Sequence, residues 1–365
     1  MSEPTTAERD TIRTTVLVYG IYGYTGLLVG REAVRRDVDI IAAGRDRVRT
    51  EAAARDLGVQ FRVVALDDAA GLDAALADVD IVAHCAGPYE RTSAPMVDAC
   101  LRTGTHYLDL TGEADVFEAV YARDSDARDA GVALVPGVGF DVVPTDHLAA
   151  VAKQALPEAI TGDIAMVSPG GFSRGTLSTA LLGMAAGNKI RVSGEFEPVA
   201  HSHRILTIDL PGSKKATVAS TPLGDLASAA RTAGLQNVTT FTALPGATLL
   251  RRLDRPMRRL LSVRGVGDAL EKLLAFVPVP SEATRGRTRS AGWVRLTDDS
   301  GRSVERSIEV DNTYAFTAKS MVQAMIALAD SPVTGALTPS TAFGVDFIDT
   351  IPGVTLVRGT AAEVG

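Results

Sequence analysis

The chain has 365 residues, of which 46% are hydrophobic and 22% are charged, and its formal net charge is −7. This length predicts two domains of an ordinary globular protein, and the negative charge excludes a general nucleic-acid binder. The two cysteines, Cys85 and Cys100, exclude a disulfide framework and a cysteine-rich metal cluster, so we expect no metal site.

The N-terminal stretch MSEPTTAERDTIRTT is polar and contains acids, so it lacks the apolar core of a signal peptide. The sequence contains no run of roughly 18 uninterrupted apolar residues, which a membrane-spanning helix would need. These two features predict a cytoplasmic protein.

From residue 14 to residue 137, short apolar runs alternate with amphipathic segments. The predicted strands cover 14–20, 38–44, 60–66, 79–87, 105–110 and 132–137. The predicted helices cover 25–36, 45–58, 68–78, 88–104 and 113–131, with a candidate break at Pro95. Apolar, β-branched runs joined by amphipathic helices predict an α/β fold, a doubly wound parallel sheet of the Rossmann type over 12–150.

Beyond residue 155 this regular alternation stops. Strands are predicted over 203–210, 214–220, 238–244, 290–298 and 302–311, and helices over 173–188, 221–234 and 315–330. The sequence DDSG between the last two strands indicates a hairpin. Because few crossover helices remain, we expect an α+β domain with a mixed sheet over 151–335, which would serve substrate binding or oligomerisation.

Three glycines follow the first predicted strand in VLVYGIYGYTGLLVG, residues 16–30. Gly20, Gly23 and Gly26 lie between that strand and the first predicted helix. A pyrophosphate needs backbone amides that no side chain obstructs, and it is stabilised by the positive end of a helix. Thr25 adds a hydroxyl donor. Glycines also form structural turns, but the strand before and the helix after them favour a dinucleotide site.

The second predicted strand ends in AAGRD, where an NAD-selective site usually carries an acid that binds the ribose hydroxyls. Here Gly44 and Arg45 occupy that position, and a guanidinium matches a 2′-phosphate and stacks on adenine. Arg47 is a second candidate, Asp46 an alternative ribose ligand, and Arg45 can also be read as a surface helix residue. The pattern favours NADP over NAD.

The fourth predicted strand ends in HCAGPY. Its small residues Cys85, Ala86 and Gly87 leave room for a cofactor, and Pro88 begins a helix where no amide hydrogen is needed. An inert Cys85 is favoured over a catalytic thiol, because no activating base is evident. The cofactor-binding candidates are Gly20, Tyr22, Gly23, Tyr24, Thr25, Gly26, Arg45, Cys85, Ala86, Gly87 and Pro88.

Six segments together resemble the saccharopine dehydrogenase-like oxidoreductases in their short bacterial form, a grouping that includes trans-acting enoyl reductases. These segments are YGIYGYTGLLVG, AGRD, CAGPY, YLDLTGE, GVGFDVVPTD and TPSTAFGVDFID. The resemblance implies a Rossmann domain, an α+β domain that covers the cofactor, and a C-terminal segment, here 336–365, that packs back on the first domain. It implies hydride transfer with a nicotinamide and specifies no substrate.

Hydride transfer to a polarised double bond needs a proton donor, and a carboxyl group in a dry pocket can serve. Glu113, Asp141 and Asp146 follow the fifth and sixth predicted strands, at the sheet edge where ligands bind. They are the catalytic candidates. Structural roles are favoured for all three, since Glu113 suits a helix N-terminus and Asp141 suits an N-cap.

The segment 249–280, LLRRLDRPMRRLLSVRGVGDALEKLLAFVPVP, is arginine-rich and amphipathic in its first part, 249–276. Such a helix can lie on an anionic membrane or pack its apolar face on the protein core, and the second arrangement is favoured. A role as a homodimer contact or a substrate channel stays open.

Together these features predict an NADP-dependent oxidoreductase that acts on a small-molecule, acyl or lipid-like substrate such as an enoyl group. The alternative is a non-catalytic NADP-binding redox sensor, because no Tyr-x-x-x-Lys pair lies on a suitable predicted helix.

Overall fold

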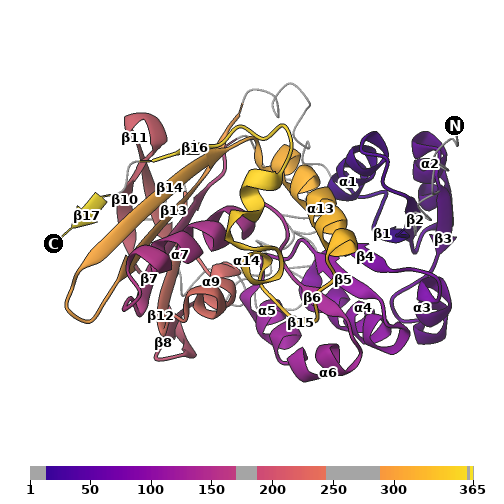
Figure 1. Ribbon diagram of the computed structural model, residues 1–365, viewed down its shortest axis with the longest axis horizontal. Coiled ribbons are helices and arrows are strands. Elements are labelled where there is room, and N and C mark those ends of the chain that lie inside the picture. The colour runs from indigo at the N-terminus through magenta and orange to yellow at the C-terminus, as the bar shows by residue number, and fades with distance from the viewer. Residues whose placement is uncertain (1–13, 170–186, 244–287, 360–361, 365) are drawn as a thin grey trace, which may run out of the picture.

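The computed structural model describes residues 14–169, 187–243, 288–359 and 362–364. Two sheets lie side by side, an N-terminal parallel sheet and a C-terminal mixed sheet (Figure 1). The predicted fold class is confirmed. Residues 173–186 of one predicted helix and the whole basic segment 249–280 lie outside the described residues, and Asn188, the last residue of that predicted helix, begins a strand.

The N-terminal sheet has seven strands, and all of its pairings are parallel. Its strands are β1 (Val16–Tyr19), β2 (Ile40–Gly44), β3 (Gln60–Val63), β4 (Ile81–His84), β5 (His106–Asp109), β6 (Ala133–Val135) and β15 (Gly335–Ala336). The order β15-β6-β5-β4-β1-β2-β3 reverses direction between β1 and β4. This reversal is the switch point beside which Rossmann sheets bind their ligands.

Helices connect these strands, and β1, β2 and β4 are buried along their whole length. The connecting helices are α1 (Tyr24–Arg35), α2 (Arg47–Leu57), α3 (Ala69–Leu76), α4 (Tyr89–Thr103), α5 (Ala114–Tyr121) and α6 (Asp124–Asp129). The break expected at Pro95 is wrong, because α4 continues through it. Arg91, whose carbonyl loses its usual helical donor there, is exposed, so water can replace that hydrogen bond.

The single helix predicted over 113–131 is two helices, α5 and α6. Between them, the Arg123 guanidinium pairs with Asp98 of α4 and with Asp126 of α6, both at 2.6 Å. The Arg123 guanidinium therefore ties the junction between α5 and α6 to α4.

The C-terminal sheet is mixed, since β12 pairs in parallel with β7 and its other pairings are antiparallel. Its strands are β7 (Thr161–Val167), β8 (Asn188–Val192), β9 (Glu195–Val199), β10 (Ile205–Leu210), β11 (Lys214–Ser220), β12 (Asn237–Thr242), β13 (Ser290–Thr297), β14 (Ser303–Val310), β16 (Val357–Arg358) and β17 (Ala362–Val364). The predicted hairpin joins β13 to β14.

The remaining helices join the two sheets. They are α7 (Val143–Ala155), α9 (Asp225–Ala233), α13 (Thr313–Asp330) and α14 (Pro339–Phe343), with short 3-10 turns η1 (Pro211–Ser213) and η2 (Val345–Thr350). Helix α7 packs on β13 and on α9, whereas α13 returns from the second sheet to pack beside α1 (Figure 1). A single apolar cluster extends from Val16 of β1 to Ile308 of β14.

The chain thus crosses between the two sheets more than once, and the predicted domain limits at 150 and 335 stay predictions. Within the described ranges, no helix is both long and apolar enough to cross a membrane.

Candidate cofactor and active site

The glycine loop, residues 20–26, is packed so tightly that side chains at its glycines would not fit. Gly20 has a φ of 83°, in the left-handed region, and a Cβ built there would lie 2.8 Å from the Ala86 Cβ. A Cβ at Gly26 would lie 2.2 Å from the Gly20 carbonyl oxygen. Gly23 is the N-cap of α1 and carries no capping side chain, so the first-turn amides of α1 are available to an anion. A dinucleotide pyrophosphate fits this loop.

Tyr22 and Arg49 form a stacked pair at the end of β2. The Tyr22 ring lies against Gly44, where a Cβ would be 2.5 Å from its Cε1, and the Arg49 guanidinium lies 4.3 Å from the ring centroid. Asp46 accepts a hydrogen bond of 3.1 Å from the Arg49 amide and so caps α2. Its carboxylate is therefore engaged by the helix, whereas Arg45 and Arg49 are exposed beside the loop. Arg49 was not predicted from the sequence, although it lies only four residues after Arg45, in the first turn of α2.

The loop after β4 adjoins the glycine loop through the contact of Ala86 with Gly20. Thr92 of α4 donates a hydrogen bond of 2.7 Å to the Ala86 carbonyl and holds this loop in place, together with Gly87 and Pro88. Burial, with the nearby Asp109 charge, raises the pKa of the Cys85 thiol to about 12. A thiol that stays protonated at neutral pH agrees with the inert interpretation.

Glu113 caps the N-terminus of α4. Its two carboxylate oxygens accept hydrogen bonds from the backbone amides of Tyr89, at 2.9 Å, and Glu90, at 2.7 Å. Burial raises the pKa of Glu113, and these two donors oppose that rise. A helix N-terminus does account for this acid, but the helix is α4, which precedes Glu113 in the chain, rather than α5, which follows it.

We expect the substitution Glu113→Ala to lower the free energy of unfolding by about 1–2 kcal/mol, because two amides at the start of α4 lose their acceptor. Glu113→Gln, which keeps one acceptor oxygen, should cost less. Urea unfolding of both variants measures the difference. Equal stability of Glu113→Ala and the parent chain would contradict the capping role.

Asp146 connects three helices. This completely buried side chain of α7 accepts hydrogen bonds from the Thr232 hydroxyl of α9 and, at 2.7 Å, from the Ser340 amide of α14. Burial raises the pKa of Asp146, although the hydrogen bonds from Thr232 and Ser340 counteract the rise. Through these contacts Asp146 anchors α9 and α14 to α7.

Asp141 follows β6 and is the least engaged of the three candidate acids. The N-cap role considered for it is wrong, because Val142 is the N-cap of α7 and has no side-chain cap. Half-buried Asp141 makes no hydrogen bond or ion pair within the described part of the chain, and burial raises its pKa to about 6. Gly112 leaves room for it, since a Cβ there would lie 3.2 Å from the Asp141 Oδ2. This carboxyl can change its protonation state near neutral pH.

Asp109 fixes the loops that carry these acids. It accepts hydrogen bonds from the amides of Thr111, at 2.9 Å, and Gly137, at 2.8 Å, and from the Tyr107 hydroxyl, at 2.8 Å. The Tyr107 hydroxyl also lies 3.1 Å from His84 Nδ1, and burial lowers the pKa of His84 to about 3, so that ring is neutral. The sequence YLDL places an acid inside an apolar strand, and this feature could have predicted a buried polar network around Asp109.

Helix α13 brings the second half of the chain to the glycine loop. The Tyr314 ring meets the Tyr24 ring edge to face, with the centroids 4.9 Å apart, and Asn312 caps α13 by accepting from the Tyr314 amide. The loop therefore contacts a residue that lies far from it in sequence.

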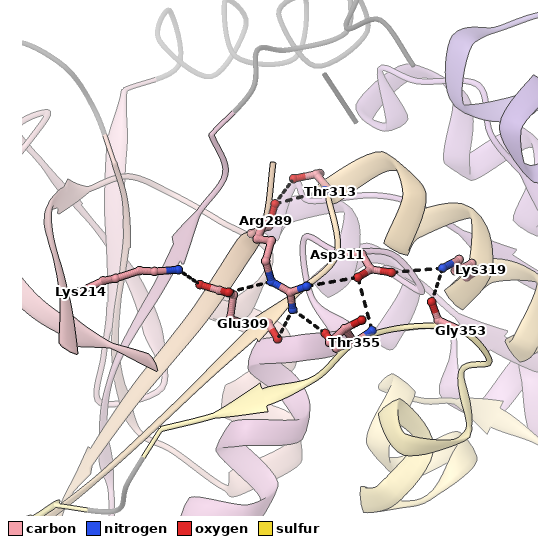
Figure 2. A network of polar contacts seen from close by, with 9 residues as sticks. Lys214, Arg289, Glu309, Asp311, Thr313, Lys319, Gly353 and Thr355 are labelled. Carbon is pink, nitrogen blue, oxygen red and sulfur yellow. Dashed lines mark hydrogen bonds and ion pairs between the residues drawn. The ribbon is translucent and has the colours of Figure 1, made fainter. Parts of the chain in front are cut away.

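An ion-pair network holds the start of α13 on the mixed sheet (Figure 2). Glu309 of β14 accepts hydrogen bonds from Lys214, at 2.5 Å, and Arg289, at 2.7 Å. Arg289 also pairs with Asp311 at 3.6 Å, and Asp311 pairs with Lys319 of α13 at 3.1 Å. Lys319 then donates to the Gly353 carbonyl, so the network also ties the C-terminal segment to α13 (Figure 2).

Comparison with known proteins relates this geometry to one family. Residues 16–135 match the family described as the saccharopine dehydrogenase NADP binding domain. A trans-acting enoyl reductase of Mycobacterium ulcerans (strain Agy99) is 33% identical over 144 residues, 36% of this chain and 33% of that protein. The saccharopine dehydrogenase-like oxidoreductase of Homo sapiens is 30% identical over 151 residues, 36% of this chain and 35% of that protein.

A solved structure shares the fold along nearly the whole chain. Saccharopine dehydrogenase (L-Glu forming) from Saccharomyces cerevisiae superposes with a TM-score of 0.62 at 13% identity, over 96% of this chain and 100% of that one. The stretches aligned by sequence cover only 33% to 43% of the length of the curated relatives.

Proposed function

We propose that the chain is an NADP-dependent oxidoreductase, because residues 16–135 match the family described as the saccharopine dehydrogenase NADP binding domain. We propose a hydrophobic acyl substrate, such as an enoyl thioester, because one of the relatives is named an enoyl reductase. The observation that carries the proposal is the glycine loop at the switch point of the sheet. A Cβ at Gly20 or Gly26 would clash with neighbouring atoms, so the turn can take this shape only with glycine at these positions.

The nicotinamide, when bound, supplies the hydride. The first-turn amides of α1 bind the pyrophosphate, and Arg45 and Arg49 bind the 2′-phosphate. Asp109 holds the ends of β5 and β6 together and so fixes the loop that carries Asp141. Asp141 then donates the proton that the substrate needs once it has accepted the hydride.

The activity is tested by following NADPH absorbance with crotonyl-coenzyme A, a ketone and an imine as probes. We expect NADPH consumption with the enoyl thioester and not with the other two. Tight NADPH binding without consumption by any probe would contradict an oxidoreductase and leave the redox sensor as the function.

We expect Arg45→Ala and Arg49→Ala each to weaken NADPH binding by about 10- to 100-fold, since each removes a charged donor to the 2′-phosphate. NADH binding should change little. Calorimetric titration with both nucleotides measures the ratio, and Arg55→Ala, an exposed arginine near the C-terminal end of α2, is the matched control. An equal loss for NADPH and NADH would contradict the assignment of these arginines.

A further inference from the structure

Helix α13 runs beside α1 in the same direction. Tyr314, near the start of α13, meets Tyr24, the first residue of α1. Further along, Gln323 of α13 accepts a hydrogen bond of 2.8 Å from Arg36, the residue that ends α1. Helix α13 also contacts β4 and β5. The start of α13 therefore lies at the same end of the first sheet as the glycine loop.

The loop between β6 and α7, residues 136–142, carries Asp141, and we call it the acid loop. The first sheet holds the beginning of this loop, because Asp109 accepts hydrogen bonds from the amides of Gly137, at 2.8 Å, and Val138, at 2.9 Å. Both amides precede Asp141 by several residues. The place of the acid itself therefore depends on contacts further along the loop.

Helix α13 supplies a contact directly before the acid. The Thr317 hydroxyl accepts a hydrogen bond of 3.1 Å from the amide of Phe140, the residue that precedes Asp141. Gly139 allows this approach, because a Cβ there would lie 3.0 Å from the Thr317 Cγ2. The rings of Phe140 and Phe316 also meet edge to face, with their centroids 6.4 Å apart. Both the backbone and the side chain before Asp141 thus rest on α13.

The start of α13 is itself fixed to the mixed sheet. The Thr313 amide donates a hydrogen bond of 3.1 Å to the hydroxyl of Ser290, the first residue of β13, and the two hydroxyls lie 2.9 Å apart. One turn further along, Lys319 pairs with Asp311 at 3.1 Å (Figure 2). Helix α13 is therefore a support that is anchored on one sheet and contacts both the glycine loop and the acid loop of the other.

We propose that Thr317 is a positioning residue for Asp141, which it holds at a fixed place relative to the glycine loop. This inference rests on the proposed function. A proton donor acts only within hydrogen-bond reach of the reacting atom, and a displacement of about 1 Å can lower the rate about 100-fold. Without the Thr317 hydroxyl, the amide of buried Phe140 loses its acceptor and moves toward water or another oxygen, which displaces Asp141.

Thr317→Val tests this role, because it keeps the shape of the side chain and removes the hydroxyl. With NADPH and crotonyl-coenzyme A we expect kcat to fall about tenfold, while KM and NADPH affinity stay within about twofold of the parent. Thr317→Ser keeps the hydroxyl and should recover most of the lost kcat. Ser320→Ala is the matched control, since Ser320 lies one turn further along α13, is completely buried and has a hydroxyl without a hydrogen-bond partner within the described residues. A parent-like kcat in Thr317→Val would overturn the proposal.

A double-mutant cycle separates positioning from a merely structural role. If Thr317 acts through Asp141, adding Thr317→Val to Asp141→Asn should lower the residual kcat by less than about twofold, because the group that it positions is already lost. A merely structural role would lower kcat by the same factor with and without Asp141, and that result would overturn the proposal. Thr317→Ala, which also removes the hydroxyl, should give the same pattern if Thr317→Val folds poorly.

Hydrogen exchange of the full-length chain tests the contact without turnover. Peptides that cover the acid loop should exchange their amide hydrogens several times faster in Thr317→Val than in the parent chain, because the loop has lost its attachment to α13. The same peptides of Ser320→Ala should exchange at the parent rate. Equal exchange of the acid loop in Thr317→Val and the parent chain would overturn the proposal.

The outcomes separate the two proposals. Turnover by the parent chain, with equal losses from Thr317→Val in both backgrounds, overturns the positioning role and leaves the oxidoreductase intact. Absence of turnover with every probe overturns the oxidoreductase and the positioning role together, and faster exchange in Thr317→Val then reports a structural contact only.

Discussion

The substitution Gly26→Ala is expected to weaken NADPH binding by at least about 100-fold and to lower the free energy of unfolding by about 1–3 kcal/mol. The new methyl group would lie 2.2 Å from the Gly20 carbonyl oxygen and 3.1 Å from the Ile21 Cα. Both atoms belong to the backbone, so no side-chain rotation relieves the clash. The loop must move as a unit, which displaces the amides that bind the pyrophosphate.

Gly30→Ala is the matched control, because Gly30 lies one turn further along α1 and faces the core. Its added Cβ would lie 2.8 Å from the terminal methyl carbons of Ile21 and Leu57, which can shift at moderate cost. We expect a similar loss of stability with an NADPH affinity within about twofold of the parent. Urea unfolding and fluorescence titration measure both quantities. If the two variants lost affinity to the same extent, general destabilisation and not the loop geometry would explain the effect.

The first sheet could be predicted from the sequence because its signals are local. Each buried strand is a short apolar run, and turn residues or N-caps such as Asp46 and Asp68 mark the starts of the helices that follow. Two predictions about helix breaks were wrong. At Pro95 the helix continues because the affected carbonyl is exposed to solvent, and between α5 and α6 the chain breaks where Arg123 contacts Asp98 of another helix. Neither condition can be read from one helix alone.

The second sheet was harder to predict, because its pairings join distant segments. The central strand β7 was missed, since Gly162 and Asp163 interrupt its apolar pattern. In the structure Asp163 accepts hydrogen bonds from Arg204, at 2.6 and 2.9 Å, and from Arg295, at 2.6 Å, on other parts of the sheet. An acid in a strand is thus stabilised by residues up to 132 positions away.

The candidate site shows the same division between local and distant information. The glycine loop is contiguous, so its residue types and spacing predict its role. The three acids cannot be ranked in this way, because the donors to Glu113 come from α4 and one donor to Asp146 lies 194 residues further along the chain.

The substitution Asp141→Asn is expected to lower kcat by about 10²- to 10⁴-fold, because an amide cannot donate the proton that the proposed reaction needs. NADPH affinity should stay unchanged, since Asp141 has no part in the glycine loop. Stopped-flow turnover with crotonyl-coenzyme A and nucleotide titration measure the two effects. A variant that retained kcat would contradict the assignment of Asp141 as proton donor.

The same substitution should make the protein more stable above pH 6. The pKa of Asp141 in the folded chain, about 6, lies above its ordinary value of 3.8. As pH rises through this interval the unfolded chain ionises Asp141 first, so the folded state of the parent loses stability, by up to about 3 kcal/mol for this group. Asp141→Asn lacks this titration, and its advantage over the parent should therefore grow between pH 4 and pH 6 and then stay constant.

Asp163→Asn, the same chemical change at a buried acid away from the site, provides the control. It breaks the ion pairs with Arg204 and Arg295, both of which are partly exposed, so we expect a loss of about 1–3 kcal/mol in stability with kcat preserved. The two Asp→Asn variants should thus change stability in opposite directions, and only the one that gains stability should lose turnover. If Asp141→Asn loses stability at pH 8, the fold needs this carboxyl. If the variant gains stability and loses turnover, Asp141 serves the reaction although it destabilises the folded protein.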